Sequence, residues 1–85
     1  MSQQDLSDVV KRKTAEIIGK IAPADLDTAK TLRSYGVSSL DLVELVSFLM
    51  RELKIKVARS ELKKIGTTDD LIAVFQNAAK LPVTP

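Results

Sequence analysis

Residues 36–45 read Gly-Val-Ser-Ser-Leu-Asp-Leu-Val-Glu-Leu, and this stretch decides the fold of the chain. Ser38 is a favourable helix N-cap, and Asp41 follows it at the spacing of a capping box. Apolar residues then recur every three or four positions, which predicts a helix from Ser38 or Ser39 to about Leu53. Its inward stripe is expected to consist of Leu42, Leu45, Val46, Leu49 and Leu53. The apolar residues that fall off this stripe, and are therefore expected at the surface, are Leu40, Val43 and Met50.

The segments on either side of this helix also show helical periodicity. A first helix is expected over about residues 5–21, with an apolar stripe that consists of Leu6, Val9, Val10, Ile17, Ile18 and Ile21. A short third helix is expected over about residues 58–65, ended by Gly66 as a C-cap glycine. The last helix should begin at Thr67 or the next residue, because Thr67 and Asp70 repeat the capping-box spacing.

A long connection, residues 22–38, joins the first two helices. A loop of this length in a small domain is usually functional or pinned to the core. Its apolar anchors are Leu26, Leu32 and Tyr35. The sequence therefore predicts an all-α four-helix bundle with three long helices, one short third helix and a long first loop. We expect one domain over residues 1–85, with a core at about 5–79 and a flexible tail at 80–85.

Composition excludes several kinds of chemistry. The chain has 85 residues, no Cys and no His, which removes disulfides, thiolate nucleophiles, imidazole bases and the usual zinc ligands. The sequence has no calcium-loop motif, so no metal site is expected. It has no apolar stretch of membrane-spanning length and no signal-peptide pattern. These features predict a soluble, cytoplasmic protein with no membrane partner.

The two serines at the start of the second helix are the candidate site. A serine hydroxyl there lies close to unpaired backbone N–H groups, and these groups and the helix dipole favour a phosphate. No His is available to activate such a serine as a nucleophile. A modified serine therefore fits better than a catalytic one, and the plain alternative is that Ser38 and Ser39 only cap the helix.

The segment Tyr35-Gly36-Val37-Ser38-Ser39-Leu40-Asp41-Leu42-Val43-Glu44-Leu45 resembles the signature of the acyl carrier protein and phosphopantetheine-binding superfamily. The resemblance runs from about Val9 to about Phe75 and implies a bundle of the acyl-carrier type. It implies that a phosphopantetheinyl transferase moves 4'-phosphopantetheine from coenzyme A to Ser39, with no catalysis by the chain itself. The arm's thiol would then hold acyl groups as thioesters for acyl-loading and acyl-processing enzymes. Residues expected to face these partners are Leu40, Asp41, Val43, Glu44, Ser47 and Arg59.

Two departures from the family pattern bear on function. The family usually has Asp before the modified serine, and here Ser38 stands there, which implies slower modification or a dedicated transferase. Fatty-acid carriers are strongly acidic along the second and third helices, whereas residues 51–64 carry six basic side chains against two acidic ones. The basic ones are Arg51, Lys54, Lys56, Arg59, Lys63 and Lys64. This charge argues for a specialised pathway with its own enzymes. The stretch Val57-Ala58-Arg59-Ser60-Glu61-Leu62 and the small size resemble discrete carriers of polyketide or hybrid polyketide–peptide pathways.

Other functions remain open on the sequence alone. An aminoacyl or peptidyl carrier would use the same Ser39 chemistry and differ only in its loading enzyme. The basic stretch also admits a small helical nucleic-acid-binding protein, or a solvated helical face. A recognition helix needs base-reading side chains on one face, and residues 58–65 offer only Arg59 and Lys63. We therefore expect transient enzyme partners, no nucleic acid and a monomeric state.

Overall fold

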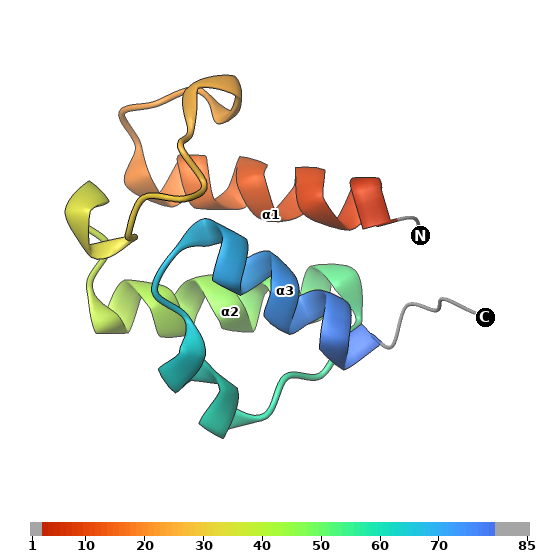
Figure 1. Ribbon diagram of the computed structural model, residues 1–85. Coiled ribbons are helices and arrows are strands. Elements are labelled where there is room, and N and C mark those ends of the chain that lie inside the picture. Colours follow the sequence, from red (N-terminus) through yellow and green to blue (C-terminus); the bar gives the residue numbers. More distant parts are fainter. Residues whose placement is uncertain (1–2, 80–85) are drawn as a thin grey trace.

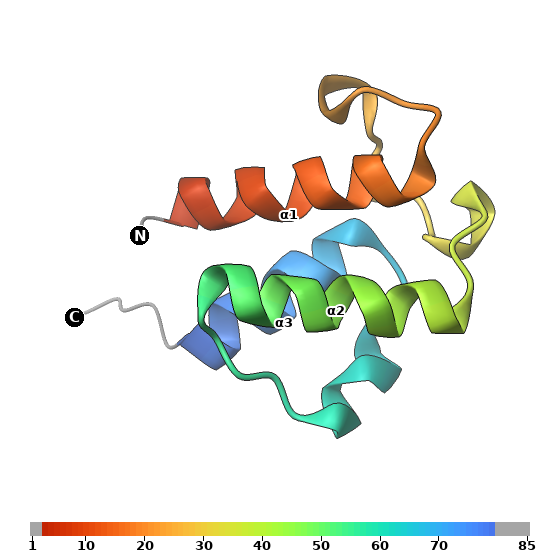
Figure 2. The same cartoon turned by 180° about the vertical axis from the view of Figure 1, so that it is seen from behind.

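The computed structural model describes residues 3–79, which form a helical bundle (Figure 1). Its frame consists of three α-helices, α1 (Gln3–Ile18), α2 (Ser39–Leu53) and α3 (Thr68–Ala79). The connections contain three 3₁₀ helices, η1 (Pro23–Asp25), η2 (Arg33–Tyr35) and η3 (Arg59–Lys64). α1 packs against both α2 and α3, and η3 lies on the side of these two helices that faces away from α1 (Figures 1 and 2). The predicted all-α architecture is confirmed.

The core between the three α-helices is almost entirely aliphatic. The largest fully buried side chains are Phe75, Leu6, Leu45, Leu49, Leu71, Val10, Thr14 and Thr68. The predicted inward stripe of α2 is confirmed, since Leu45, Val46, Leu49 and Leu53 are buried and Leu42 is half-buried. Each α-helix therefore presents one apolar face inward, which leaves the opposite face of α2 free for another role.

The first helix differs from expectation at its C-terminal end. α1 ends at Ile18 because Gly19 adopts φ +80, a left-handed conformation, and its N–H donates to the Ala15 carbonyl at 2.9 Å. The prediction that Ile17 faces the core was wrong, since this side chain is 38% exposed. Thr14 is buried instead, and its hydroxyl donates to the Val10 carbonyl at 2.7 Å, so the buried polar group is satisfied.

The long connection is pinned to the core, as predicted. Leu26 and Leu32 are buried and Tyr35 is half-buried. The Leu32 N–H donates to the Gly66 carbonyl at 2.8 Å, and the Asp69 N–H donates to the Thr28 carbonyl at 3.0 Å. These bonds tie the loop to the start of α3 and so fix the point at which the chain enters α2.

The third helix and its glycine need correction. The segment expected as a short helix over residues 58–65 is the 3₁₀ helix η3, and its C-cap is Ile65 rather than Gly66. The Gly66 N–H instead donates to the Asp70 carboxylate at 2.9 Å, as does the Thr67 N–H at 3.0 Å. The Asp70 N–H donates to Thr67 Oγ1 at 3.1 Å, which confirms the second capping box.

Asp70 gives stability that should depend on pH. Hydrogen bonds from the backbone N–H groups of Gly66 and Thr67 lower the pKa of Asp70. A carboxyl whose pKa is lowered on folding stabilises the fold above its ordinary pKa, and this contribution is lost as pH falls through the lowered value. Asp70→Asn should therefore cost about 1 kcal/mol at pH 7, and less at about pH 3. Urea unfolding at both pH values measures the difference; Asp69→Asn, an exposed neighbour, is the control, and an Asp70→Asn cost that is unchanged at low pH would contradict the assignment.

Candidate functional site

The two serines at the start of α2 have different environments. Ser38 is the N-cap, and its Oγ accepts a hydrogen bond from the Asp41 N–H at 3.1 Å. The Asp41 carboxylate accepts in return from the Ser38 N–H at 3.1 Å, which completes the predicted capping box. Gly36 adopts φ +86 just before, so the chain can turn sharply into the helix. The Ser38 hydroxyl is therefore occupied in holding the helix end.

Ser39 is the first residue of α2, and its side chain is exposed. Within residues 3–79, its hydroxyl makes no hydrogen bond, and the backbone N–H groups of Ser39 and Leu40 have no acceptor. A phosphate bonded to Ser39 Oγ would meet these N–H groups at the positive end of the α2 dipole. The residues at this helix end thus fit a phosphodiester on Ser39, which the capped Ser38 does not offer.

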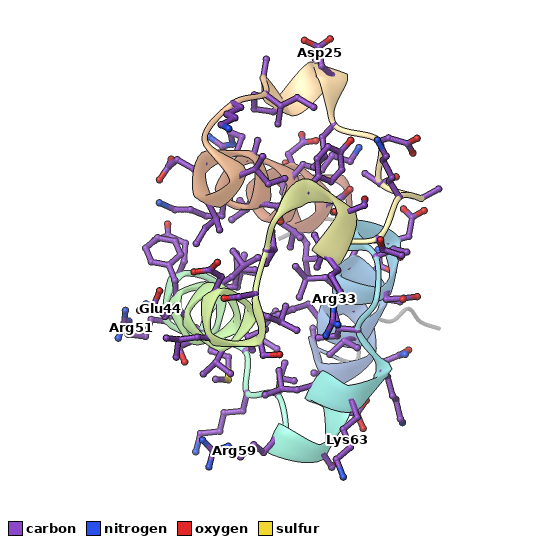
Figure 3. All side chains as sticks on the ribbon, turned by 90° about the vertical axis from the view of Figure 1, so that its left-hand side faces the viewer. Asp25, Arg33, Glu44, Arg51, Arg59 and Lys63 are labelled. Carbon is purple, nitrogen blue, oxygen red and sulfur yellow. The ribbon has the colours of Figure 1, made fainter. Side chains whose placement is uncertain are left out.

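An open cavity of about 430 Å³ lies beside Ser39, between α2 and η3. Its apolar wall includes Leu42, Leu62 and Ile65, and its rim includes Arg33 and both serines. The Arg33 side chain points from η2 toward η3 (Figure 3) and forms no ion pair in the part of the chain that the structure describes. The cavity could therefore receive an apolar chain, with a cation available for a phosphate.

The sequence interpretation missed Arg33. This residue lies in the long connection, and the hydrogen bond from the Leu32 N–H to the Gly66 carbonyl brings that connection beside η3. The contact joins positions far apart in the chain, so helical periodicity and motif spacing do not indicate it. A single arginine in a loop gave no signal by which it could have been found.

Most residues predicted to face partners lie together on the outer side of α2. Leu40 is 70% exposed, Val43 is 36% exposed, Glu44 is exposed and Ser47 is half-buried. Asp41 has a different role, because its carboxylate accepts the hydrogen bond of the capping box. Arg59 is exposed on η3, apart from Glu44 on α2 (Figure 3).

Met50 is less exposed than its place off the inward stripe predicts. Its side chain is half-buried, and its Sδ accepts a hydrogen bond from the Val57 N–H at 3.3 Å. The joint after α2 therefore folds back over Met50.

Every helix in the described part of the chain is too short or too polar to span a membrane.

Comparison with known proteins places these features in a family. Residues 8–75 match the family described as phosphopantetheine attachment site. The chain is 31% identical over 75 residues to an acyl carrier protein of Thermotoga maritima, covering 88% of this chain and 93% of that protein. It is 33% identical over 86 residues to an acyl carrier protein of Saccharopolyspora erythraea, covering 93% and 90%.

A third similarity is partial. A stretch of 56 residues is 38% identical to the highly reducing polyketide synthase dmxL2 of Cryptosporiopsis sp., covering 62% of this chain and 2% of that protein. No solved structure matches the chain. The family match and the two relatives, each covered over most of its length, together identify the family. The chain belongs to the acyl carrier protein family, whose members are non-catalytic carriers with a covalently attached 4'-phosphopantetheine.

Proposed function

We propose that Ser39 holds the phosphopantetheine arm and that the chain carries acyl groups for the enzymes of a polyketide-type pathway. The observation that carries this proposal is the exposed Ser39 hydroxyl, which has no hydrogen bond within residues 3–79, at the N-terminus of α2. Ser39 Oγ forms the new bond to phosphorus, adenosine 3',5'-bisphosphate leaves from coenzyme A, and the hydroxyl proton passes to a base on the transferase. The attached arm supplies a thiol that forms thioesters, a group that the Cys-free chain lacks.

The residues around Ser39 have supporting roles in this proposal. The unpaired N–H groups at the start of α2 and the Arg33 guanidinium favour the phosphate charge. Leu42, Leu62 and Ile65 offer an apolar wall beside the attachment point. Leu40 and Val43 give a partner enzyme an exposed apolar contact next to it. The transferase and the acyl-processing enzymes are expected to share this face in turn, in the cytoplasm.

Two observations favour a polyketide-type pathway. The partial similarity to a polyketide synthase covers 2% of that protein and 62% of this chain. All six basic residues of the stretch from Arg51 to Lys64 are exposed, which matches poorly with the basic docking surfaces expected of fatty-acid enzymes. An aminoacyl carrier shares the Ser39 chemistry and is separated from this proposal by its loading enzyme.

A thiol count follows the whole cycle, because the chain contains no Cys. Treatment with coenzyme A, Mg²⁺ and a broad-specificity transferase should raise the thiol content from zero to one per chain. Loading should then return it to zero. We expect the acyltransferase domain of a polyketide synthase to load the chain with a kcat/KM about tenfold above that of a fatty-acid malonyltransferase.

The comparison needs a third loading enzyme and a cognate control. An amino-acid adenylation domain, offered the same modified chain, tests the aminoacyl alternative, and each enzyme's own carrier shows that it is active. Fastest loading by the adenylation domain would make the chain an aminoacyl carrier. Fastest loading by the fatty-acid enzyme would remove the polyketide assignment and keep the carrier role. No thiol after treatment with several transferases would reject attachment itself.

A further inference from the structure

A stripe of side chains runs along the solvent side of α2, beginning next to Ser39. Steps of three and four residues place its members opposite the buried Leu45 and Leu49. This outer stripe consists of Leu40, Val43, Ser47, Met50 and Lys54, of which Ser47 and Met50 are half-buried. Leu40 and Val43, 70% and 36% exposed, make its first part apolar. An enzyme that reaches an arm on Ser39 meets this apolar part first.

The far end of the outer stripe is basic and hollowed. A depression of about 540 Å³ is lined by Ser47, Met50, Arg51, Lys54, Ile55 and Lys56. Its three cations are exposed, and none has a carboxylate partner among the described residues. Figure 3 shows Arg51 projecting outward from α2, and Arg59 and Lys63 projecting from η3. The unpaired positive charge therefore extends from the end of α2 toward η3.

Of the three cations that line the depression, only one has a role in the stability of α2. Arg51 lies in the last turn of α2, where a cation favours the helix dipole. Lys54 is the C-cap at φ 57, a left-handed conformation in which glycine has less strain, and Lys56 lies beyond the helix. Neither lysine is needed for the local backbone. Their charge is free to attract a partner.

We infer that the outer stripe docks an acidic surface of a folded partner enzyme. In this arrangement Leu40 and Val43 contact apolar groups of the enzyme, while its carboxylates bind Arg51, Lys54 and Lys56. The inference rests on the proposed function, because it requires an enzyme to approach Ser39. It adds that the partner's docking surface has the opposite charge to the basic surface expected of fatty-acid enzymes.

The distribution of charge favours a protein over other polyanions. Glu44 lies on the same flank of α2 as Arg51 (Figure 3), and along the sequence it lies between the apolar and the basic residues of the stripe. This carboxylate repels the continuous phosphates of a nucleic acid or an anionic membrane, whereas a folded surface can place a cation or an apolar group against it. Base reading also needs several Arg, Asn or Gln on one face, and the stripe has only Arg51 beside it.

The test uses the intact chain with its arm attached, as verified by mass, and follows backbone amides by NMR. The probe is a helical peptide of about 18 residues with a leucine face flanked by glutamates. A lysine version, a random DNA duplex and phosphatidylglycerol vesicles are compared with it. Shifts are expected over residues 40–56 with the acidic peptide, and its Kd should rise about fivefold or more as NaCl rises from about 50 to about 300 mM.

A charge-matched pair of variants makes the test specific. Arg51→Glu with Lys56→Glu avoids the strained backbone at Lys54 and should raise the Kd about tenfold. Arg12→Glu with Lys20→Glu makes the same change in net charge at exposed positions elsewhere, and should leave the Kd within about twofold. Equal weakening by both pairs, equal binding of the lysine peptide, or tighter binding of duplex or vesicles would overturn the inference. Absence of shifts over residues 40–56 would also overturn it, while the attached arm, already seen by mass, would keep the proposed function.

Discussion

Replacing Ser39 with alanine should abolish attachment of phosphopantetheine and leave the stability of the fold unchanged. Ser38→Ala should leave attachment intact and lower the stability. The Ser39 hydroxyl is exposed and makes no hydrogen bond within residues 3–79, so its loss removes the attachment point without disturbing a contact. The Ser38 hydroxyl accepts from the Asp41 N–H, and removing such a cap costs about 1 kcal/mol. Intact mass after treatment with coenzyme A and a transferase measures the first effect. Urea unfolding measures the second.

The two serines control for each other, and Ser60→Ala adds an exposed serine of η3 that should affect neither measurement. An increment that survives Ser39→Ala and disappears in Ser38→Ala would move the attachment site to Ser38. That outcome would mean that the capping box opens when the transferase binds. An increment that survives both changes would place the arm elsewhere on the chain.

The start of α2 could be predicted from sequence because local chemistry determines it. The capping box joins residues only three positions apart, and both of its hydrogen bonds are present. The inward stripe of α2 follows from helical spacing alone, and the burial of Leu45, Leu49 and Leu53 agrees with it. The placement of Ser39 at the first helical position follows from the same signal.

The features that sequence did not reveal depend on backbone conformation or on distant contacts. The left-handed Gly19 ends α1 three residues before Ile21, although the apolar pattern continues. Thr14 is buried because its hydroxyl bonds to a backbone carbonyl of its own helix, so a polar residue occupies a core position. Arg33 reaches the cavity beside Ser39 only because the long connection is tied to Gly66.

Phe75→Ala should be the most destabilising single change in the fold. Phe75 is completely buried in a core that is otherwise aliphatic, and truncation of a buried phenylalanine costs about 3–5 kcal/mol. A chain of this size has a free energy of unfolding of only about 5–10 kcal/mol, so the substitution would remove a large part of it. Urea unfolding followed by circular dichroism measures the loss as a lower midpoint with a similar slope.

Two variants show whether the loss comes from the cavity. Phe75→Leu retains most of the apolar volume and should cost about 1–2 kcal/mol, because packing changes while burial remains. Leu40→Ala removes apolar atoms from a side chain that is 70% exposed, and should cost less than about 0.5 kcal/mol. This ordering separates the two apolar faces of the chain: Phe75 stabilises the fold, whereas Leu40 is available to a partner beside Ser39. Similar costs for Phe75→Ala and Leu40→Ala would mean that Leu40 is packed in solution, and the outer stripe would lose its apolar end.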